Sequence, residues 1–204
     1  MTRFPRPLPT GCGHLAQLDA PLAALTVEAP RIGRWGRRLA AVLLGGGRLL
    51  AAGNGGSASQ ASHLTSELVG RYRDDRPPFS ALALCSETSA ITAIGNDYGV
   101  GEVFARQVRG HGRSGDVLVA LSTSGRSANV LAAVEAAGAC GMTSLALSGR
   151  PGNPLAARCD DALCVDSAHT ATIQEVHLIA IHMLCAAVDA ALASPPLTVA
   201  GGAR

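Results

Sequence analysis

Residues 53–67 read GNGGSASQASHLTSE and place a glycine-rich turn just before a histidine and a glutamate. His63 and Glu67 are four positions apart, so on a helix their side chains project from the same face. An imidazole and a carboxylate held together can move protons to and from a substrate, or they can bind a metal ion such as zinc. Taken alone, however, the spacing HxxxE is more typical of solvated or structurally paired side chains than of a reactive site.

The turn itself has the features of an anion site. It follows the short apolar run RLLAAG (48–53), and a helix is predicted after it over residues 57–69, with Ser57 near its N-cap. Glycines allow the backbone to approach a ligand closely, and the amides at a helix start favour an anion. The turn does not match GxGxxG and no acidic residue closes the next strand, so no nucleotide cofactor is expected. A turn that merely needs flexibility would explain the glycines equally well.

A second loop, rich in hydroxyl groups, follows another apolar run. In DVLVALSTSGRSANV (116–130), four hydroxyl side chains surround Gly125 just before a predicted helix: Ser122, Thr123, Ser124 and Ser127. A phosphate monoester accepts many hydrogen bonds, so this composition is typical of a phosphate cradle. The plainer alternative is a capped helix with extra serines, although no Glu or Gln stands where a capping box needs one. Two such loops, each at the end of a strand, favour a phosphorylated ligand.

The elements that must position these side chains alternate along the chain. The apolar strands expected are 48–53, 80–85, 116–122, 143–149 and 161–166, and each is followed by a helix or helical turn. Before them, residues 14–46 are expected to form two helices or one helix broken at Pro21 and Pro30. Further helices are expected over 86–97, 100–112, 127–141 and 170–192. Continuously apolar strands predict an α/β fold with an open five-stranded parallel sheet flanked by helices. Ligands of such sheets bind at the carboxyl ends of the strands.

Length and composition exclude several classes of protein. The 204 residues suit a single domain, placed at 14–193, with flexible tails at 1–13 and 194–204. A charged fraction of 16% and a net charge of +2 are too mild to indicate a nucleic-acid or membrane partner. The six cysteines form no CxxC pair, which favours a reduced, cytoplasmic protein. The N-terminus lacks the apolar core of a signal peptide, and no apolar run is expected to reach membrane-spanning length.

The motifs together resemble a known family. STSGRSANV is similar to the phosphate loop of the sugar isomerase (SIS) domain family, and GNGGSAS, GRY, AIGNDYG and IQEVHLIAIH resemble its phosphoheptose isomerase branch in the same order. The likeness covers residues 14 to 192. It implies an SIS-type α/β/α sandwich and the conversion of sedoheptulose 7-phosphate to D-glycero-D-manno-heptose 7-phosphate in heptose biosynthesis. It also implies a homotetramer with sites near subunit interfaces and, in some members, one zinc ion per subunit.

The resemblance also implies roles for individual residues. Glu67 matches a catalytic base and His182 a catalytic acid, which would move a proton between C1 and C2 of the sugar through an enediol. A zinc ion would be held by His63, Glu67, Gln174 and His182. The substrate would be bound by Asn54, Gly55, Gly56, Ser57, Glu67, Arg71, Asn96, Asp97, Ser122, Thr123, Ser124, Ser127 and Gln174. From the residues alone, Arg71 fits a surface position as well as a phosphate contact, and Glu67 cannot easily be both tight metal ligand and free base.

Helix geometry constrains the last predicted helix. His177 lies five positions before His182, about 140° round the helix, so the two cannot face the same site and His177 is assigned a structural or supporting role. Gln174 and His182 are eight positions apart, which spans about 12 Å. Either the helix begins irregularly around Gln174 or a neighbouring subunit completes the site, and we favour the neighbouring subunit.

One departure and three alternatives accompany the resemblance. Many isomerases of this branch carry an acidic or basic residue just before IQE, where this chain has Ala171 and Thr172, so a related phosphorylated ketose is an alternative substrate. The alternative from another class is a non-catalytic SIS module that binds a sugar phosphate or a replication initiator. Such modules tend to lack the acid–base pair, whereas this chain has both Glu67 and His182. An isomerase of arabinose 5-phosphate usually carries a nucleotide-sensing tandem domain, and no such domain is expected in this chain.

Overall fold

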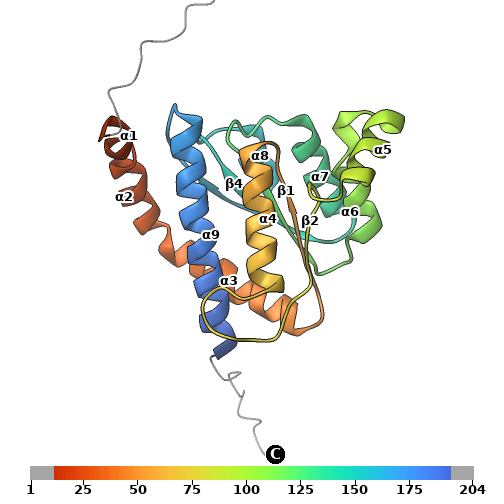
Figure 1. The fold of residues 1–204 in the computed structure, drawn as a ribbon, viewed down its shortest axis with the longest axis horizontal. Coiled ribbons are helices and arrows are strands. Elements are labelled where there is room, and N and C mark those ends of the chain that lie inside the picture. Colours follow the sequence, from red (N-terminus) through yellow and green to blue (C-terminus); the bar gives the residue numbers. More distant parts are fainter. Residues whose placement is uncertain (1–11, 194–204) are drawn as a thin grey trace, which may run out of the picture.

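Five short, mostly apolar strands form one parallel sheet between two layers of helices (Figure 1). The structure is a computed structural model in which residues 12–193 are described. The strand order across the sheet is β2-β1-β3-β4-β5. The strands are β1 (Leu49–Ala52), β2 (Ala81–Ala83), β3 (Val117–Ser122), β4 (Thr143–Ser148) and β5 (Asp161–Cys164). The predicted α/β fold with an open five-stranded parallel sheet is thus confirmed.

The helices connect the strands and cover both faces of the sheet. Those before β1 are α1 (Cys12–Ala16), α2 (Asp19–Val27) and α3 (Ala29–Leu44). Between the strands lie α4 (Gly56–Val69), α5 (Thr88–Tyr98), the 3-10 turn η1 (Val100–Glu102), α6 (Ala105–His111), α7 (Ala128–Ala139) and α8 (Pro154–Arg158). The chain described here ends with α9 (Thr170–Ala193).

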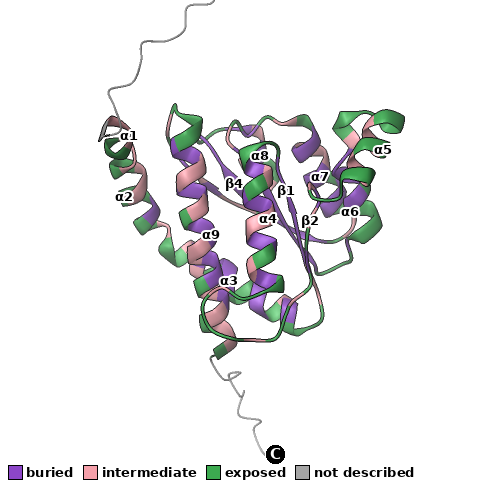
Figure 2. Cartoon of the chain, in the orientation of Figure 1, coloured by how far each residue is buried: buried purple, intermediate pink, exposed green. Residues whose placement is uncertain are grey.

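Alternate residues of the strands point into two separate cores, except in the edge strand β2, where Leu82 is exposed. Leu49 and Ala51 of β1 lie in the core shared with α3, α4 and α9, whereas Leu50 and Ala52 lie in the core shared with α6 and α7. Because side chains alternate along a strand, a sheet covered on both faces needs apolar residues at every position. This two-sided burial explains why the strands are continuously apolar (Figure 2).

The N-terminal segment differs from the prediction. Residues 14–46 form parts of three helices, not two helices or one broken helix. Neither proline is the break, because Pro21 lies in the first turn of α2 and Pro30 is the second residue of α3, where no helical hydrogen bond needs their missing N–H. Helix α1 begins at Cys12, two residues before the predicted domain boundary. The remainder of the two predicted tails lies outside the described residues.

Helix α9 corrects the expectation that no apolar run reaches membrane-spanning length. Among the described residues it is the one helix long and apolar enough to cross a membrane by length and composition. In the fold it packs against α3 and α4, and its buried residues join the core on that face of the sheet. A Cβ at Gly36 of α3 would overlap Ala187, so the glycine allows the two helices to approach closely.

The sheet brings the two candidate ligand loops together. β1 pairs with β3, with Ala52 opposite Ala120, and both strands are parallel. Their carboxyl ends therefore meet at one edge of the sheet, where residues 53–56 follow β1 and residues 123–127 follow β3. This is the edge at which open α/β sheets bind their ligands.

Candidate functional site

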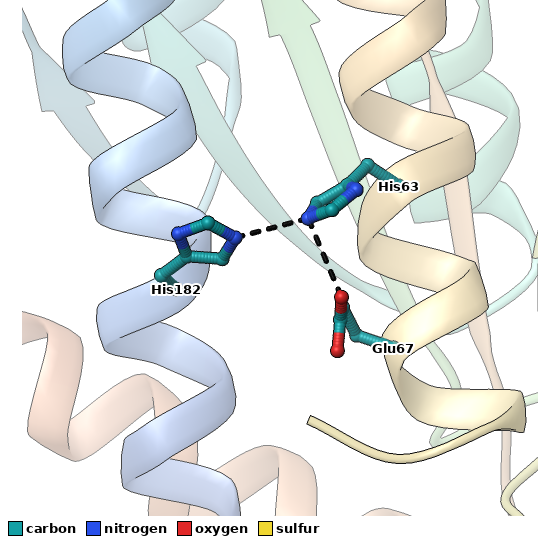
Figure 3. A group of neighbouring side chains, drawn as sticks. All are labelled: His63, Glu67 and His182. Atoms are coloured by element: carbon teal, nitrogen blue, oxygen red, sulfur yellow. Dashed lines mark hydrogen bonds and ion pairs between the residues drawn. The ribbon is translucent and has the colours of Figure 1, made fainter. Parts of the chain in front are cut away.

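Three side chains from α4 and α9 meet in one cluster (Figure 3). The Nε2 atom of His63 lies 3.0 Å from Nε2 of His182 and 3.4 Å from Oε1 of Glu67. One ligand atom from each of the three residues lies within 4.8 Å of the other two. His63 and Glu67 share a face of α4, as their spacing predicts, and the packing of α9 against α4 adds His182.

The ring of Tyr72 stacks on the imidazole of His182. The two ring centroids are 5.6 Å apart and the ring planes differ by 29°. Tyr72 lies in the GRY segment just after α4, beside Arg71, the residue of that segment predicted to bind the substrate. The position of an aromatic side chain next to Arg71 was the one sequence feature that could have indicated Tyr72 as a site residue. The stack limits the orientations open to the His182 imidazole.

Arg76 secures the end of α4 that carries Glu67. Its guanidinium donates hydrogen bonds to the carbonyl oxygens of Glu67 and Leu68 and forms a 2.9 Å ion pair with Asp189 of α9. These bonds satisfy carbonyls that a helix end leaves unpaired and join α4 to α9. Oε2 of Glu67 is buried and has no hydrogen-bond partner among the described residues. A bound ion or a proton would satisfy that oxygen.

The hydroxyl-rich loop after β3 is compact and ordered by its own side chains. Oγ of Ser122 lies 3.0 Å from Oγ of Ser127 and 3.4 Å from Oγ of Ser124. The backbone N–H of Gly125 donates to Oγ of Ser122, and Gly125 has a φ of +61°, which favours glycine. Thr123 and Ser124 line an open cavity of about 550 Å³. The loop thus presents converging hydroxyl groups beside a cavity that could hold an anion.

Further polar residues line the same cavity. Arg126 extends from the loop itself, and Arg150 follows β4. Thr170 and Ile173 line it from the first turns of α9. Both arginines carry positive charge to the side of the loop where Thr123 and Ser124 lie, and positive charge there favours a phosphoryl group.

A reciprocal amide pair links the two candidate loops. Asn54 and Asn129 each donate to the side-chain oxygen of the other, at 2.8 Å in both directions. Ser57 lies near the N-cap, as predicted: Gly55 is the N-cap, α4 begins at Gly56, and Ser57 is buried within the first turn. The exposed ligand groups of this loop are therefore Asn54 and the backbone of the two glycines.

Gln174 does not join the three-residue cluster within one chain. The side-chain amide of Gln174 lies against Gly56, where a Cβ would overlap it. The backbone carbonyl oxygen of Gln174 accepts a hydrogen bond from the side chain of Gln60. Helix α9 is continuous from Thr170, so no irregular start brings Gln174 nearer to His182. The amide thus belongs to the glycine loop, roughly 12 Å along the helix from His182.

The structure also separates three other predicted residues from the cluster. Asn96 and Asp97 lie at the exposed end of α5 and bond to each other, and α5 and α9 are far apart (Figure 1). Arg71 is exposed just after α4 and donates to the carbonyl oxygen of Arg73. Within one chain these side chains do not meet His63, Glu67 and His182.

His177 faces the interior, as the helix geometry predicts. It is fully buried, and its Nε2 lies 3.1 Å from the carbonyl oxygen of Ser148 at the end of β4. Burial lowers the pKa of His177 to about 4, because the charged imidazolium loses its hydration there. The imidazole is therefore neutral at pH 7 and takes no direct part in the cluster.

Acid is expected to destabilise the protein through His177. In the unfolded chain this histidine titrates near 6.5 and in the folded chain near 4, so the unfolded state binds more protons between these values. The free energy of unfolding should fall as pH drops from 6.5 to 4, by about 3 kcal/mol at most. Urea unfolding at several pH values would measure it, with His177→Gln as the comparison. An equally steep fall in the variant would contradict this assignment.

Comparisons with known proteins agree with the geometry. Residues 15–149 match the family model of the SIS domain. A phosphoheptose isomerase of Streptomyces coelicolor is 65% identical over 184 residues, covering 90% of this chain and 80% of that protein. One of Thiobacillus denitrificans is 50% identical, covering 88% and 93%. The solved structure of a phosphoheptose isomerase from Neisseria gonorrhoeae superimposes with a TM-score of 0.80 at 41% identity, covering 87% of this chain and 97% of that one.

Proposed function

The chain belongs to the SIS domain family, in its phosphoheptose isomerase branch, and from this premise we propose that it converts sedoheptulose 7-phosphate to D-glycero-D-manno-heptose 7-phosphate. The reaction is an aldose–ketose isomerisation that supplies heptose biosynthesis. The observation that carries the proposal is the cluster in which Glu67 and His63 of α4 meet His182 of α9. A carboxylate and an imidazole in one place are what an enediol mechanism needs.

The two loops would hold the phosphate and orient the sugar. The hydroxyl groups of Ser122, Thr123, Ser124 and Ser127, together with backbone amides, suit the three acceptor oxygens of a phosphoryl group. Asn54, fixed by Asn129, would contact a sugar hydroxyl, as would the amide of Gln174 beside Gly56. His63 lies seven residues along α4 from Gly56, roughly 10 Å away. A long sugar anchored by its phosphate would thus extend toward the cluster.

Proton transfer would proceed at the two carbons farthest from the phosphate. Glu67 would remove a proton from C1 of the ketose, and His182 would give a proton to the carbonyl oxygen at C2, which yields the enediol. Glu67 would then return its proton to C2, and His182 would take the proton from the C1 hydroxyl to leave the aldehyde. Each residue ends as it began. Tyr72, stacked on His182, would keep the imidazole oriented during both transfers.

The cluster also fits a zinc ion. Two imidazole nitrogens and a carboxylate oxygen are ligands that zinc prefers, and catalytic zinc commonly takes three protein ligands. The buried, unpartnered Oε2 of Glu67 indicates a carboxylate built to meet a further group. His63, Glu67 and His182 would hold the ion, whereas Gln174 of the same chain does not reach it. When bound, zinc would supply polarisation of the sugar's carbonyl oxygen. Glu67 and His182 would then serve as its ligands in place of their roles as free base and acid, because a coordinated lone pair cannot also take a proton.

Removing one zinc ligand should remove the metal. In His63→Ala we expect the zinc content to fall from about one ion per chain to a small fraction of that, because zinc sites lose most affinity with a ligand. The loss should also lower the melting temperature, since a ligand that binds only the folded state stabilises it. Elemental analysis of protein purified without chelators measures the first effect, and thermal unfolding with and without chelator the second. His111→Ala is the matched control, because His111 is exposed at the end of α6. Wild-type protein without metal and insensitive to chelator would contradict the zinc proposal.

Assembly would bring the separated residues to the site. Helix α5 has no buried residue although five of the eleven residues in its sequence, TSAITAIGNDY, are apolar, so a neighbouring subunit would cover it. Asn96 and Asp97 at its end would then reach the cluster of another chain. We propose a homotetramer with its sites near subunit interfaces, located in the cytoplasm. A dissociated variant with full activity would contradict this arrangement.

A direct assay separates the enzyme from a non-catalytic binding module. Sedoheptulose 7-phosphate is incubated with the protein and the aldose phosphate is identified by NMR, with arabinose 5-phosphate tested in parallel. Formation of the manno-heptose phosphate, and no turnover of the pentose, supports the proposal. Tight binding of sugar phosphates without turnover of any of them would instead support a regulatory module.

A further inference from the structure

The buried imidazole of His177 makes one directional hydrogen bond. Its Nε2 lies 3.1 Å from the carbonyl oxygen of Ser148, which can only accept, so Nε2 carries the proton. The other ring nitrogen, Nδ1, is buried and has no hydrogen-bond partner within residues 12–193. An unpaired buried acceptor costs free energy that an apolar side chain of similar size would not. What histidine contributes at this position, compared with an apolar side chain, is therefore the hydrogen bond to Ser148.

Ser148 is the junction between α9 and the loop after β3. It is fully buried at the carboxyl end of β4, where it pairs with Ser122 of β3. Its carbonyl oxygen accepts from His177 and also from the backbone N–H of Val165, at 2.9 Å. Its hydroxyl donates to the carbonyl oxygen of Ser122, at 3.3 Å. Ser122 in turn holds the loop through Ser127 and the N–H of Gly125.

The residues after Ser148 pack directly on the same loop. Gly149 has no room for a Cβ, which would overlap the carbonyl oxygen of Thr123. Asn153 lies against Gly125, and the backbone N–H of Leu155 donates to the carbonyl oxygen of Gly125 at 3.0 Å. A displacement of the carboxyl end of β4 would therefore move the hydroxyl-rich loop with it, because the two segments are closely packed and leave no space between them.

We propose that His177 is a positioning residue for the phosphate loop, acting through Ser148 and Ser122. The inference rests on the proposed function only in taking phosphate as the loop's ligand. His177 touches neither substrate nor the three-residue cluster. Its neutral imidazole fixes the end of β4, and the end of β4 fixes the hydroxyl groups that would receive the phosphoryl oxygens.

The test compares His177→Leu, which keeps an apolar side chain of similar size, with His177→Gln, whose amide can still donate to Ser148. Affinity for inorganic phosphate is measured by titration calorimetry. His177→Leu is expected to raise the Kd about tenfold, and His177→Gln to restore most of the affinity. With the sugar phosphate, KM should rise by a similar factor while kcat stays within about threefold. His111→Leu, at the exposed end of α6, should change neither constant.

Specific outcomes would overturn the inference. Equal phosphate affinity in wild type and a folded His177→Leu would show a merely structural role, as would a fall in kcat with KM unchanged. If His177→Leu does not fold, Ser148→Ala removes only the hydroxyl bond to Ser122, and an unchanged Kd in that variant would equally overturn it. Turnover is measured separately in the wild type. A wild-type protein that binds phosphate through this network but isomerises no ketose would contradict the proposed function and leave the inference intact.

Discussion

Glu67→Gln should lower kcat by about three orders of magnitude without unfolding the protein. The substitution keeps the size and polarity of the side chain but removes its ability to take a proton, and general base catalysis contributes roughly 10² to 10⁴ in rate. The backbone of residue 67 stays bound by Arg76 through its carbonyl oxygen, which the substitution does not touch. Affinity for inorganic phosphate should therefore change little, because the loop after β3 is not altered.

The matched control is Glu135→Gln on α7. Glu135 is an exposed glutamate paired with Arg158, away from the cluster on the other face of the sheet, so its variant should retain wild-type kcat. Initial rates and calorimetry on both variants measure the effect. A Glu67→Gln enzyme within tenfold of the wild-type kcat would show that another group removes the proton.

His182→Asn should lower kcat by about two to three orders of magnitude. The variant keeps a polar side chain but loses the atom that reaches His63 and exchanges protons with the sugar oxygens. The variant also loses the stack with Tyr72, so the segment after α4 that carries Tyr72 is expected to become more flexible. The KM for the sugar phosphate should change far less than kcat, since the proposed phosphate contacts lie in the loop after β3.

His111→Asn is the control for this substitution, because His111 is exposed at the end of α6. The two variants are compared by kcat, by KM and by melting temperature. If His182→Asn kept its kcat and raised only KM, the residue would bind substrate and another group would serve as the acid.

The strand and helix pattern was predictable because each signal is local. Apolar runs such as Leu49–Ala52 are buried on both faces of the sheet, so every residue of the run is apolar. That continuous pattern is typical of a parallel sheet. The breaks before β1 were not predictable from prolines, because Pro21 and Pro30 lie at helix starts, where proline is tolerated. Ser57 was correctly placed near the start of α4, but the N-cap itself is Gly55, with a φ of +54° that no local spacing predicts.

The site was predictable in the parts that one helix determines. His63 and Glu67 meet because residues four apart share a helix face. His177 and His182 point in different directions because residues five apart lie on different faces of the helix. The approach of His182 to α4 depends on how α9 packs, which local spacing does not determine, and the family resemblance supplied that pairing. Tyr72 and Asn129 were missed because their roles arise only from contacts distant in sequence. In the proposed assembly, Asn96 and Asp97 would act at the site of a neighbouring subunit, which the sequence of one chain does not place.

The central claim is that a phosphate anchored after β3 leaves the reacting carbons between Glu67 and His182. A crystal structure of Glu67→Gln with sedoheptulose 7-phosphate tests it most directly. The expected result is a phosphoryl group bound by Ser122, Ser124 and Ser127, with C1 and C2 in contact with residues 67 and 182 of the assembly. A sugar whose C1 and C2 lie away from both residues in every subunit would contradict the account.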